Sequence, residues 1–403
     1  MSVLARDVAQ EFGFRFGRMA KVSRAPGRVN LIGEHTDYND GFVMPAALEF
    51  ATLIAAAPRP DRRLVVYSMI MDETREFDLD RPAADGPRTT PGASPGVGAG
   101  GRDWSDYVFG VAVMLEKSGR RLGGADLVVF TDVPLGAGLS SSAALEVSVA
   151  HALLTAAGLP FEPIVIAKVC QHAENDYVGM RCGIMDQYVS ACGVEGHALL
   201  IDCRSLESRA VPIAQNLRLV IANSNVRHEH AGGEYNARRA ACEEGVRILR
   251  PYLGPIRALR DVTPKELERH RRVLPERVHR RCRHVVTENA RVLEAERTLK
   301  AGDFAACGKA MNASHASMRD DFEITCPEID FLAGFAQAQR GVYGSRMTGG
   351  GFGGCTVSLV EADAVEPVKE VLVEAYRQAC GLEADVSVCS PSEGAGLVRL
   401  DEH

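Results

Sequence analysis

The segment from Val133 to Val147, VPLGAGLSSSAALEV, restricts the possible folds more than any other stretch of this 403-residue chain. It ends a run of apolar and β-branched residues, Ala125–Val133, that is typical of a strand. It then opens a segment with helical spacing, Ser141–Ala157. The sequence therefore predicts a strand, a glycine-rich loop and a helix in direct succession.

The loop in this segment has the chemistry of a phosphate-binding turn. Gly136 and Gly138 let the backbone approach a ligand closely, and three consecutive serines place hydroxyls beside the unpaired N–H groups of the helix start. An ordinary serine-capped turn explains one serine but not three. The pattern G-x-x-x-x-G-K-[ST] does not occur in the sequence, so any phosphoryl transfer must use a fold other than that of the P-loop proteins.

The rest of the chain alternates short apolar runs with helical periods, which predicts an α/β or α+β protein. A boundary near Asp202–Pro212 would divide it into two domains, residues 1–205 and 206–403. Arg81–Gly101, rich in Pro and Gly, is predicted to be a surface loop of the first domain. Further strands are expected at Leu48–Pro58, Leu217–Ser224 and Cys355–Glu361, and further helices at Phe161–Tyr177, Asn236–Leu249, Pro275–Ala301 and Ala364–Cys380.

Composition narrows the class of protein. Forty-six basic and 53 acidic residues give a net charge of −7, which argues against a nucleic-acid surface. Seven arginines between Arg269 and Arg283 are interpreted as the solvated face of a helix. No stretch approaches the roughly 18 uncharged apolar residues of a membrane span. Eleven cysteines without a C-x-x-C pair indicate reduced thiols in a cytoplasmic protein. The sequence gives no sign of an obligate protein partner.

A second glycine-rich loop lies in RMTGGGFGGCTVSLV, Arg346–Val360, with five glycines within six residues directly before a predicted strand. A tight turn with a β-bulge would account for one or two of these glycines. Five favour a main chain that packs against a ligand or against another loop.

Polar groups suited to a hydroxyl-rich ligand gather in RAPGRVNLIGEHTDYNDG, Arg24–Gly41. Each buried sugar hydroxyl must both donate and accept a hydrogen bond, so donors and acceptors have to be concentrated in one place. Four side chains there meet this need: Arg28, Glu34, His35 and Asp37.

Three segments resemble the GHMP kinase superfamily in their order and rough spacing along the chain: Arg24–Gly41, Val133–Val147 and Arg346–Val360. Within the first of them, GRVNLIGEHTDYNDG is similar to the signature of the galactokinase family of that superfamily. MDQYVSACG (Met185–Gly193) and RDDFEITCPEID (Arg319–Asp330) also resemble family segments. The resemblance implies a two-lobed α+β fold. A mixed-sheet N-terminal domain with helices and an α/β C-terminal domain would enclose an active site between them. It also implies phosphorylation of α-D-galactose at the C1 hydroxyl, with ATP as co-substrate and Mg²⁺ as cofactor.

The same resemblance assigns roles to individual residues. Asp186 would be the catalytic base and Arg28 its partner, which stabilises the transition state; a carboxylate near the anomeric hydroxyl can accept its proton as the bond to phosphorus forms. Galactose would contact Glu34, His35, Asp37, Gly183 and Tyr235. The phosphates would contact Gly136, Ala137, Gly138, Leu139, Ser140, Ser141 and Ser142, with Trp104 beside the adenine and Mg²⁺ at Ser142 and Glu174.

Two other functions fit the same residues. The chain could phosphorylate a related sugar, such as N-acetylgalactosamine, galacturonate or arabinose, or it could be a galactose sensor without catalysis. His228 and His230 look like a metal pair, but strand alternation alone points both imidazoles the same way, so we interpret them as structural or exposed.

Overall fold

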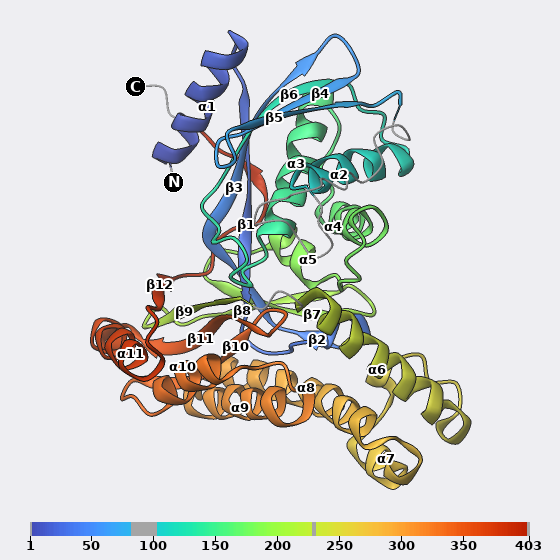
Figure 1. The fold of residues 1–403 in the computed structure, drawn as a ribbon, viewed down its shortest axis with the longest axis vertical. Helices are drawn as coiled ribbons and strands as arrows, with labels where there is room; N and C mark the ends of the chain where they lie inside the picture. The colour runs from blue at the N-terminus through green and yellow to red at the C-terminus, as the bar shows by residue number, and fades with distance from the viewer. Residues whose placement is uncertain (1, 82–102, 228–230, 401–403) are drawn as a thin grey trace.

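A computed structural model describes residues 2–81, 103–227 and 231–400 (Figure 1). Most of the predicted surface loop, as well as His228 and His230, falls outside these ranges. Five strands of the first part of the chain and β13, from near its end, form a six-stranded sheet in which every pair is antiparallel except β4 and β6. Its order is β13 (Gly396–Leu397), β1 (Lys21–Asn30), β3 (Pro45–Arg59), β6 (Gly124–Thr131), β4 (Arg63–Ser68) and β5 (Glu73–Asp78).

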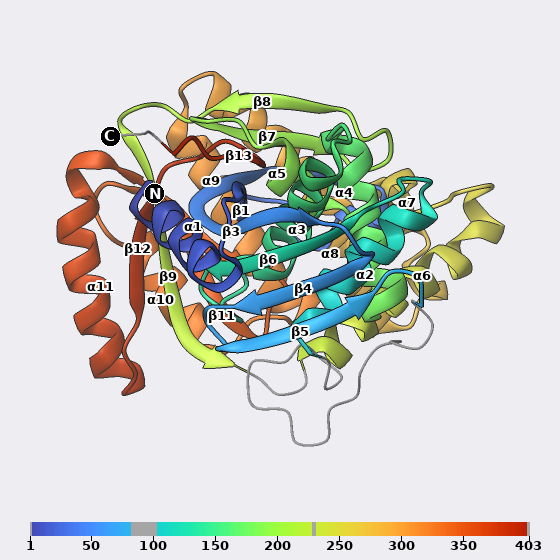
Figure 2. The same cartoon turned by 90° about the horizontal axis from the view of Figure 1, so that it is seen from above.

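The two faces of this sheet are covered by different helices, because side chains alternate along each strand. Leu53 and Ala55 of β3 pack toward α1 (Ser2–Phe16), which lies across one face (Figure 2). Ile54 and Ala56 point to the other face and its main core. That core is formed with α2 (Ser105–Lys117), α3 (Ser141–Ala157), α4 (Pro163–His172) and α5 (Met185–Cys192).

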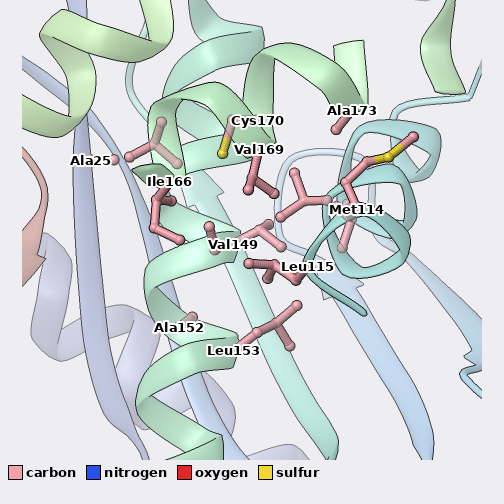
Figure 3. Packing of buried hydrophobic residues seen from close by; sticks show 14 of the residues in the cluster. Ala25, Met114, Leu115, Val149, Ala152, Leu153, Ile166, Val169, Cys170 and Ala173 are labelled. Atoms are coloured by element: carbon pink, nitrogen blue, oxygen red, sulfur yellow. The ribbon is translucent and has the colours of Figure 1, made fainter. Parts of the chain in front are cut away.

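Figure 3 shows side chains from these helices gathered in the core. Leu115 of α2, Val149 of α3 and Ile166 of α4 converge in one buried hydrophobic cluster. Burial of this kind contributes roughly 1.5–3 kcal/mol for each large apolar side chain. The helix that carries the predicted phosphate loop at its start is therefore fixed along its length.

The second part of the chain contains a four-stranded antiparallel sheet, with helices packed below it in Figure 1. The sheet order is β10 (Val342–Thr348), β11 (Gly353–Glu361), β9 (Leu217–Arg227) and β12 (Asp385–Cys389). A small sheet joins β2 (Phe42–Val43), β7 (His197–Asp202) and β8 (Ser208–Pro212). The helices are α6 (Ala231–Leu253), α7 (Pro264–Arg269), α8 (Glu276–Lys300), α9 (Phe304–Ser317), α10 (Pro327–Gln337) and α11 (Val365–Cys380).

One hydrophobic cluster joins the two parts of the chain. It combines Val29 and Leu139 from the first part with Val292, Met311 and Val357 from the second. The two glycine-rich loops and the polar segment after β1 lie around this cluster. The architecture is the two-part α+β fold that the resemblance implied.

The predicted elements agree closely with the structure. All four predicted strands are present, and the helix predicted at Ser141–Ala157 has these bounds in α3. The helix predicted at Phe161–Tyr177 is instead α4 followed by a π-helical turn, Ala173–Val178. In the ranges that the structure describes, no helix is long and apolar enough to cross a membrane.

Candidate active site

The predicted phosphate loop has an unusual backbone conformation. Gly136 and Gly138 have φ of 70° and 79°, and Ser140, directly before α3, is left-handed with φ of 59°. Left-handed backbone costs about 1–2 kcal/mol for a residue with a Cβ, and strain of this kind gathers at functional sites. Ser140 makes no side-chain cap to α3, so the serine-capped turn does not describe this loop.

The hydroxyl of Ser140 instead donates a hydrogen bond to Asp186 Oδ2. Arg28 donates to both oxygens of the same carboxylate, from Nε to Oδ1 and from Nη2 to Oδ2, each at 2.8 Å. Its third nitrogen, Nη1, donates to the carbonyl of Gly138 at 2.6 Å. Arg28 thus joins the predicted base to the phosphate loop across 158 sequence positions. The Asp186 side chain is 25% exposed and remains open to a ligand.

Glu174 lies close enough to Ser142 for the serine hydroxyl to lower the pKa of its carboxyl group. Glu174 lies in the π-helical turn, a feature frequent at functional sites. Its Oε2 accepts a hydrogen bond from Gln187 Nε2 at 2.6 Å, and the same nitrogen donates to Glu146 Oε2 at 3.0 Å. Burial, and then the charge of Asp186, raise the pKa of Glu174 to about 7.

These groups fit a divalent cation bound partly by substrate phosphates. Glu146 Oε1 is buried without a partner among the described residues, and two buried carboxylates share one amide nitrogen. In the described ranges no three His, Cys, Asp or Glu side chains gather in an arrangement suited to a metal. Mg²⁺ does not need such a cluster, because it keeps several waters and binds one or two carboxylates together with phosphate oxygens.

His35, a predicted sugar residue, contacts the second glycine-rich loop and several aromatic rings. His35, left-handed with φ of 61°, donates from Nε2 to the carbonyl of Gly350 at 3.2 Å, so its Nδ1 accepts from the Tyr38 hydroxyl at 2.7 Å. Burial lowers the pKa of His35 to about 3, and the imidazole is neutral. The rings of Tyr235 and Phe322 pack against it at tilted angles, with ring centroids 5.0 and 4.8 Å away.

Asp37 begins a 3₁₀ turn, Asp37–Asn39, and lies against Gly183. A methyl group at Gly183 would overlap the Asp37 carboxylate, which explains why a glycine stands there. Burial, and then the charge of Asp186, raise the pKa of Asp37 to about 7. Asp37 and Asp186 are therefore close enough to influence each other, which brings the two ends of the predicted site together.

The second glycine-rich loop packs against the first. A Cβ at Gly349 would lie 2.7 Å from the carbonyl oxygen of Gly138, and one at Gly354 would lie 2.9 Å from that of Ala137. The amide of Gly349 donates to Glu34 Oε1 at 2.9 Å. The prediction that this loop packs against another loop is confirmed.

Trp104 is the predicted site residue least connected to the others. It precedes α2, and its indole packs against the core of the first part. Its Nε1 is buried and has no hydrogen-bond partner within the described chain. The structure therefore leaves its proposed place beside adenine as a prediction.

Three residues at this site were not singled out in the sequence: Glu146, Gln187 and Arg346. Glu146 lies one turn after the serines, so it could have been found by helical spacing. Gln187 directly follows Asp186, and adjacent helical residues do not share a face, so spacing gives no signal for it. Arg346 contacts the sugar segment across 312 sequence positions, and no local signal announces it.

Comparison with known proteins assigns the chain to a family. Family models described as "GHMP kinases N terminal domain" and "GHMP kinases C terminal" match residues 106–194 and 295–378. Together with the fold and the phosphate loop, they define a kinase of the GHMP class. A model described as "Galactokinase galactose-binding signature" matches residues 10–58. Relatives that match nearly the full chain at 46 and 47% identity show that the chain belongs to the galactokinase family.

Its relatives match over nearly the full chain. It is 46% identical to a galactokinase of Roseiflexus sp. (strain RS-1), over 94% of this chain and 93% of that protein. It is 47% identical to a galactokinase of Chloroflexus aurantiacus, over 100% and 99%. The crystal structure of Lactococcus lactis galactokinase complexed with galactose superposes with a TM-score of 0.90 at 33% identity, covering 98% of this chain and 100% of that one.

Proposed function

We propose that this protein is a galactokinase that transfers the γ-phosphoryl group of ATP to the C1 hydroxyl of α-D-galactose, giving galactose 1-phosphate and ADP. The observation that carries the proposal is the pair formed by Arg28 and Asp186, which connects the sugar segment to the phosphate loop. We also propose that the enzyme is cytoplasmic. The division expected from the sequence, into domains 1–205 and 206–403, is part of the same proposal.

In this mechanism Asp186 accepts the proton of the C1 hydroxyl as the new bond to phosphorus forms. Arg28 fixes both oxygens of that carboxylate, so the acceptor does not have to reorient during the reaction. Its charge, close to Gly138 of the phosphate loop, stabilises negative charge on the transferring group. The sugar hydroxyls are held by Glu34, His35, Asp37, Gly183 and Tyr235.

The nucleotide phosphates contact the backbone from Gly136 to Ser142, at the positive end of α3. Ser142 and Glu174 would hold Mg²⁺, which, when bound, neutralises charge on the β- and γ-phosphate oxygens. Gln187 holds Glu174 in place for this task through its amide. Trp104 lies beside the adenine.

A transfer assay tests the proposal. The purified protein is incubated with ATP, Mg²⁺ and galactose, and the product is identified by ³¹P NMR as the 1-phosphate. A parallel panel contains N-acetylgalactosamine, galacturonate and arabinose. Equal or faster turnover of one of these sugars would reject galactose as the substrate, and binding of galactose and ATP without transfer would indicate a sensor.

A further inference from the structure

The carboxylate of Glu34 is held by groups from the second part of the chain. Its Oε1 accepts a hydrogen bond from the amide of Gly349 at 2.9 Å and lies 3.5 Å from Nη1 of Arg346. Both contacts fall on the same oxygen. The carboxylate therefore has a preferred rotation about its terminal bond, and Oε2 is the oxygen left for a ligand.

Arg346 is buried to an extent that is unusual for an arginine. It is 0% exposed and has the largest fully buried side chain of the residues that the structure describes. Nη1 donates to the carbonyl of Asn30 at 2.8 Å, Nη2 reaches only the sulfur of Met318, and Nε has no partner in the described chain. A buried guanidinium with so few good acceptors contributes little to the stability of the fold. An apolar residue at such a position often gives a more stable protein.

The other buried acid near Arg346 is already satisfied. Glu288 binds Arg291 at 2.6 Å and accepts a hydrogen bond from the amide of Gly33 at 3.0 Å. Burial lowers the pKa of Arg346, and the charges of Glu34 and then Glu288 oppose that shift. Burial also raises the pKa of Glu34, and the charges of Arg346 and then Arg28 oppose it. Glu34 is therefore the acid that Arg346 contacts directly, and its charge is the first of those that favour the ionised guanidinium.

We propose that Arg346 is a positioning residue for sugar binding, which keeps the buried Glu34 carboxylate oriented so that it can bind a galactose hydroxyl. The proposal rests on the proposed galactokinase function. Arg346 acts through Glu34 and does not itself touch the sugar. The affinity for galactose is thus set in part by a strand of the second part of the chain, far in sequence from the sugar segment.

A double-mutant cycle tests this proposal with galactose binding measured by calorimetry in the absence of ATP. We expect Arg346→Met to weaken galactose binding about tenfold or more, the loss of a charged hydrogen-bond partner, and to change ATP affinity by less than about threefold. Glu34→Gln should also weaken galactose binding. The double variant should bind galactose no more weakly than Glu34→Gln alone, because Arg346 has no other route to the sugar.

Additive losses in the cycle, or unchanged galactose affinity in Arg346→Met, would overturn the proposal. Arg24→Met is the matched control, since Arg24 is also buried but binds the carbonyls of Leu48 and Glu393 and the hydroxyl of Ser392. It should lower the melting temperature without weakening galactose binding. Where Arg346→Met does not fold, Arg346→Lys takes its place in the cycle, with a smaller expected loss and the same non-additivity.

This experiment separates the two proposals. A wild-type protein that binds galactose but transfers no phosphate would reject the kinase mechanism and leave the cycle interpretable. A wild-type protein that phosphorylates galactose, combined with additive losses, would reject only the role of Arg346.

Discussion

At the scale of single residues, the site consists of polar groups that are buried or partly buried, and each is hydrogen-bonded to a group from another segment. Asp186 is held by Arg28 and Ser140, Glu174 by Gln187, and Glu34 by Gly349 and Arg346. Such preorganised groups stabilise developing charge because they do not have to reorient during the reaction. The consequences of removing one group can therefore be predicted separately for binding and for catalysis.

Asp186→Ala should keep galactose binding within a few-fold but lower kcat by at least about two orders of magnitude, the scale expected for loss of a general base. The test is a comparison of kcat from steady-state assays with galactose affinity from calorimetry. Glu195→Ala is the control, because Glu195 is an exposed acid in the loop after α5. A kcat near that of the wild type would contradict the assignment of Asp186.

The buried acid Asp37 predicts a pH dependence of stability. Its pKa is raised from 3.8 to about 7 in the folded protein, so folding takes up a proton between these values. This group therefore makes the free protein less stable as the pH rises from about 4 to about 7. The Asp37→Asn variant has no carboxyl group at this position and lacks the effect. Its free energy of unfolding, relative to that of the wild type, should therefore increase as the pH rises from about 4 to about 7 and stay constant at higher pH.

Urea unfolding of both proteins at pH 5 and pH 8, without galactose, measures this difference. His35 has the opposite effect in both proteins, because its pKa is lowered and stability is lost as the pH falls below about 6.5. It therefore cancels in the comparison. A stability difference that does not change with pH would show that Asp37 is ionised throughout.

At the scale of elements, the site depends on two glycine-rich loops that touch through their backbones. Gly349 has φ of 92°, and its α-carbon faces Gly138 of the other loop. Its amide also holds Glu34. The position therefore excludes a side chain for two reasons: the left-handed conformation and the contact with the phosphate loop.

Gly349→Ala should lower kcat/KM by about tenfold or more and destabilise the protein by about 1–2 kcal/mol, the cost of a left-handed residue with a Cβ. Gly350→Ala is the matched control. Its Cβ would meet only the Tyr235 ring, at an ordinary 3.6 Å. Steady-state kinetics and thermal unfolding of both variants test this, and equal effects would show that the contact between the loops is unimportant.

At the scale of the whole molecule, one hydrophobic cluster joins the first and second parts of the chain. Leu31 and Leu139 from one part contact the same cluster as Val292 and Val357 from the other. The sugar segment is also bound by groups from both parts. Neither part completes the site alone.

The shared cluster predicts that the chain unfolds in a single transition. Fluorescence of Trp104, the single tryptophan and a residue of the first part, should show the same urea midpoint as far-UV circular dichroism. Val357→Ala, a change in the second part, should lower both midpoints together. Two separate midpoints, or a Trp104 transition that Val357→Ala leaves unchanged, would show that the parts unfold independently.

The local sequence alone determined the elements and the loops. The run from Val133 to Val147 predicts α3 and the turn before it, because glycine, serine and helical spacing act within a few residues. The polar segment around Glu34 and the five glycines after Thr348 are equally local signals. The arginines near α8 show the limit, since Arg281, predicted to be solvated, is buried and paired with Glu323.

Only the tertiary structure decided which charges meet. Arg346 finds Glu34 and Gln187 joins Glu146 to Glu174 through contacts between distant segments, and such contacts follow from how helices and sheets pack. The free energy of a buried charge depends on its neighbours in space and not on its neighbours in sequence. For this reason the sequence determined the kind of site, while the packing of the two parts determined how its charges are held.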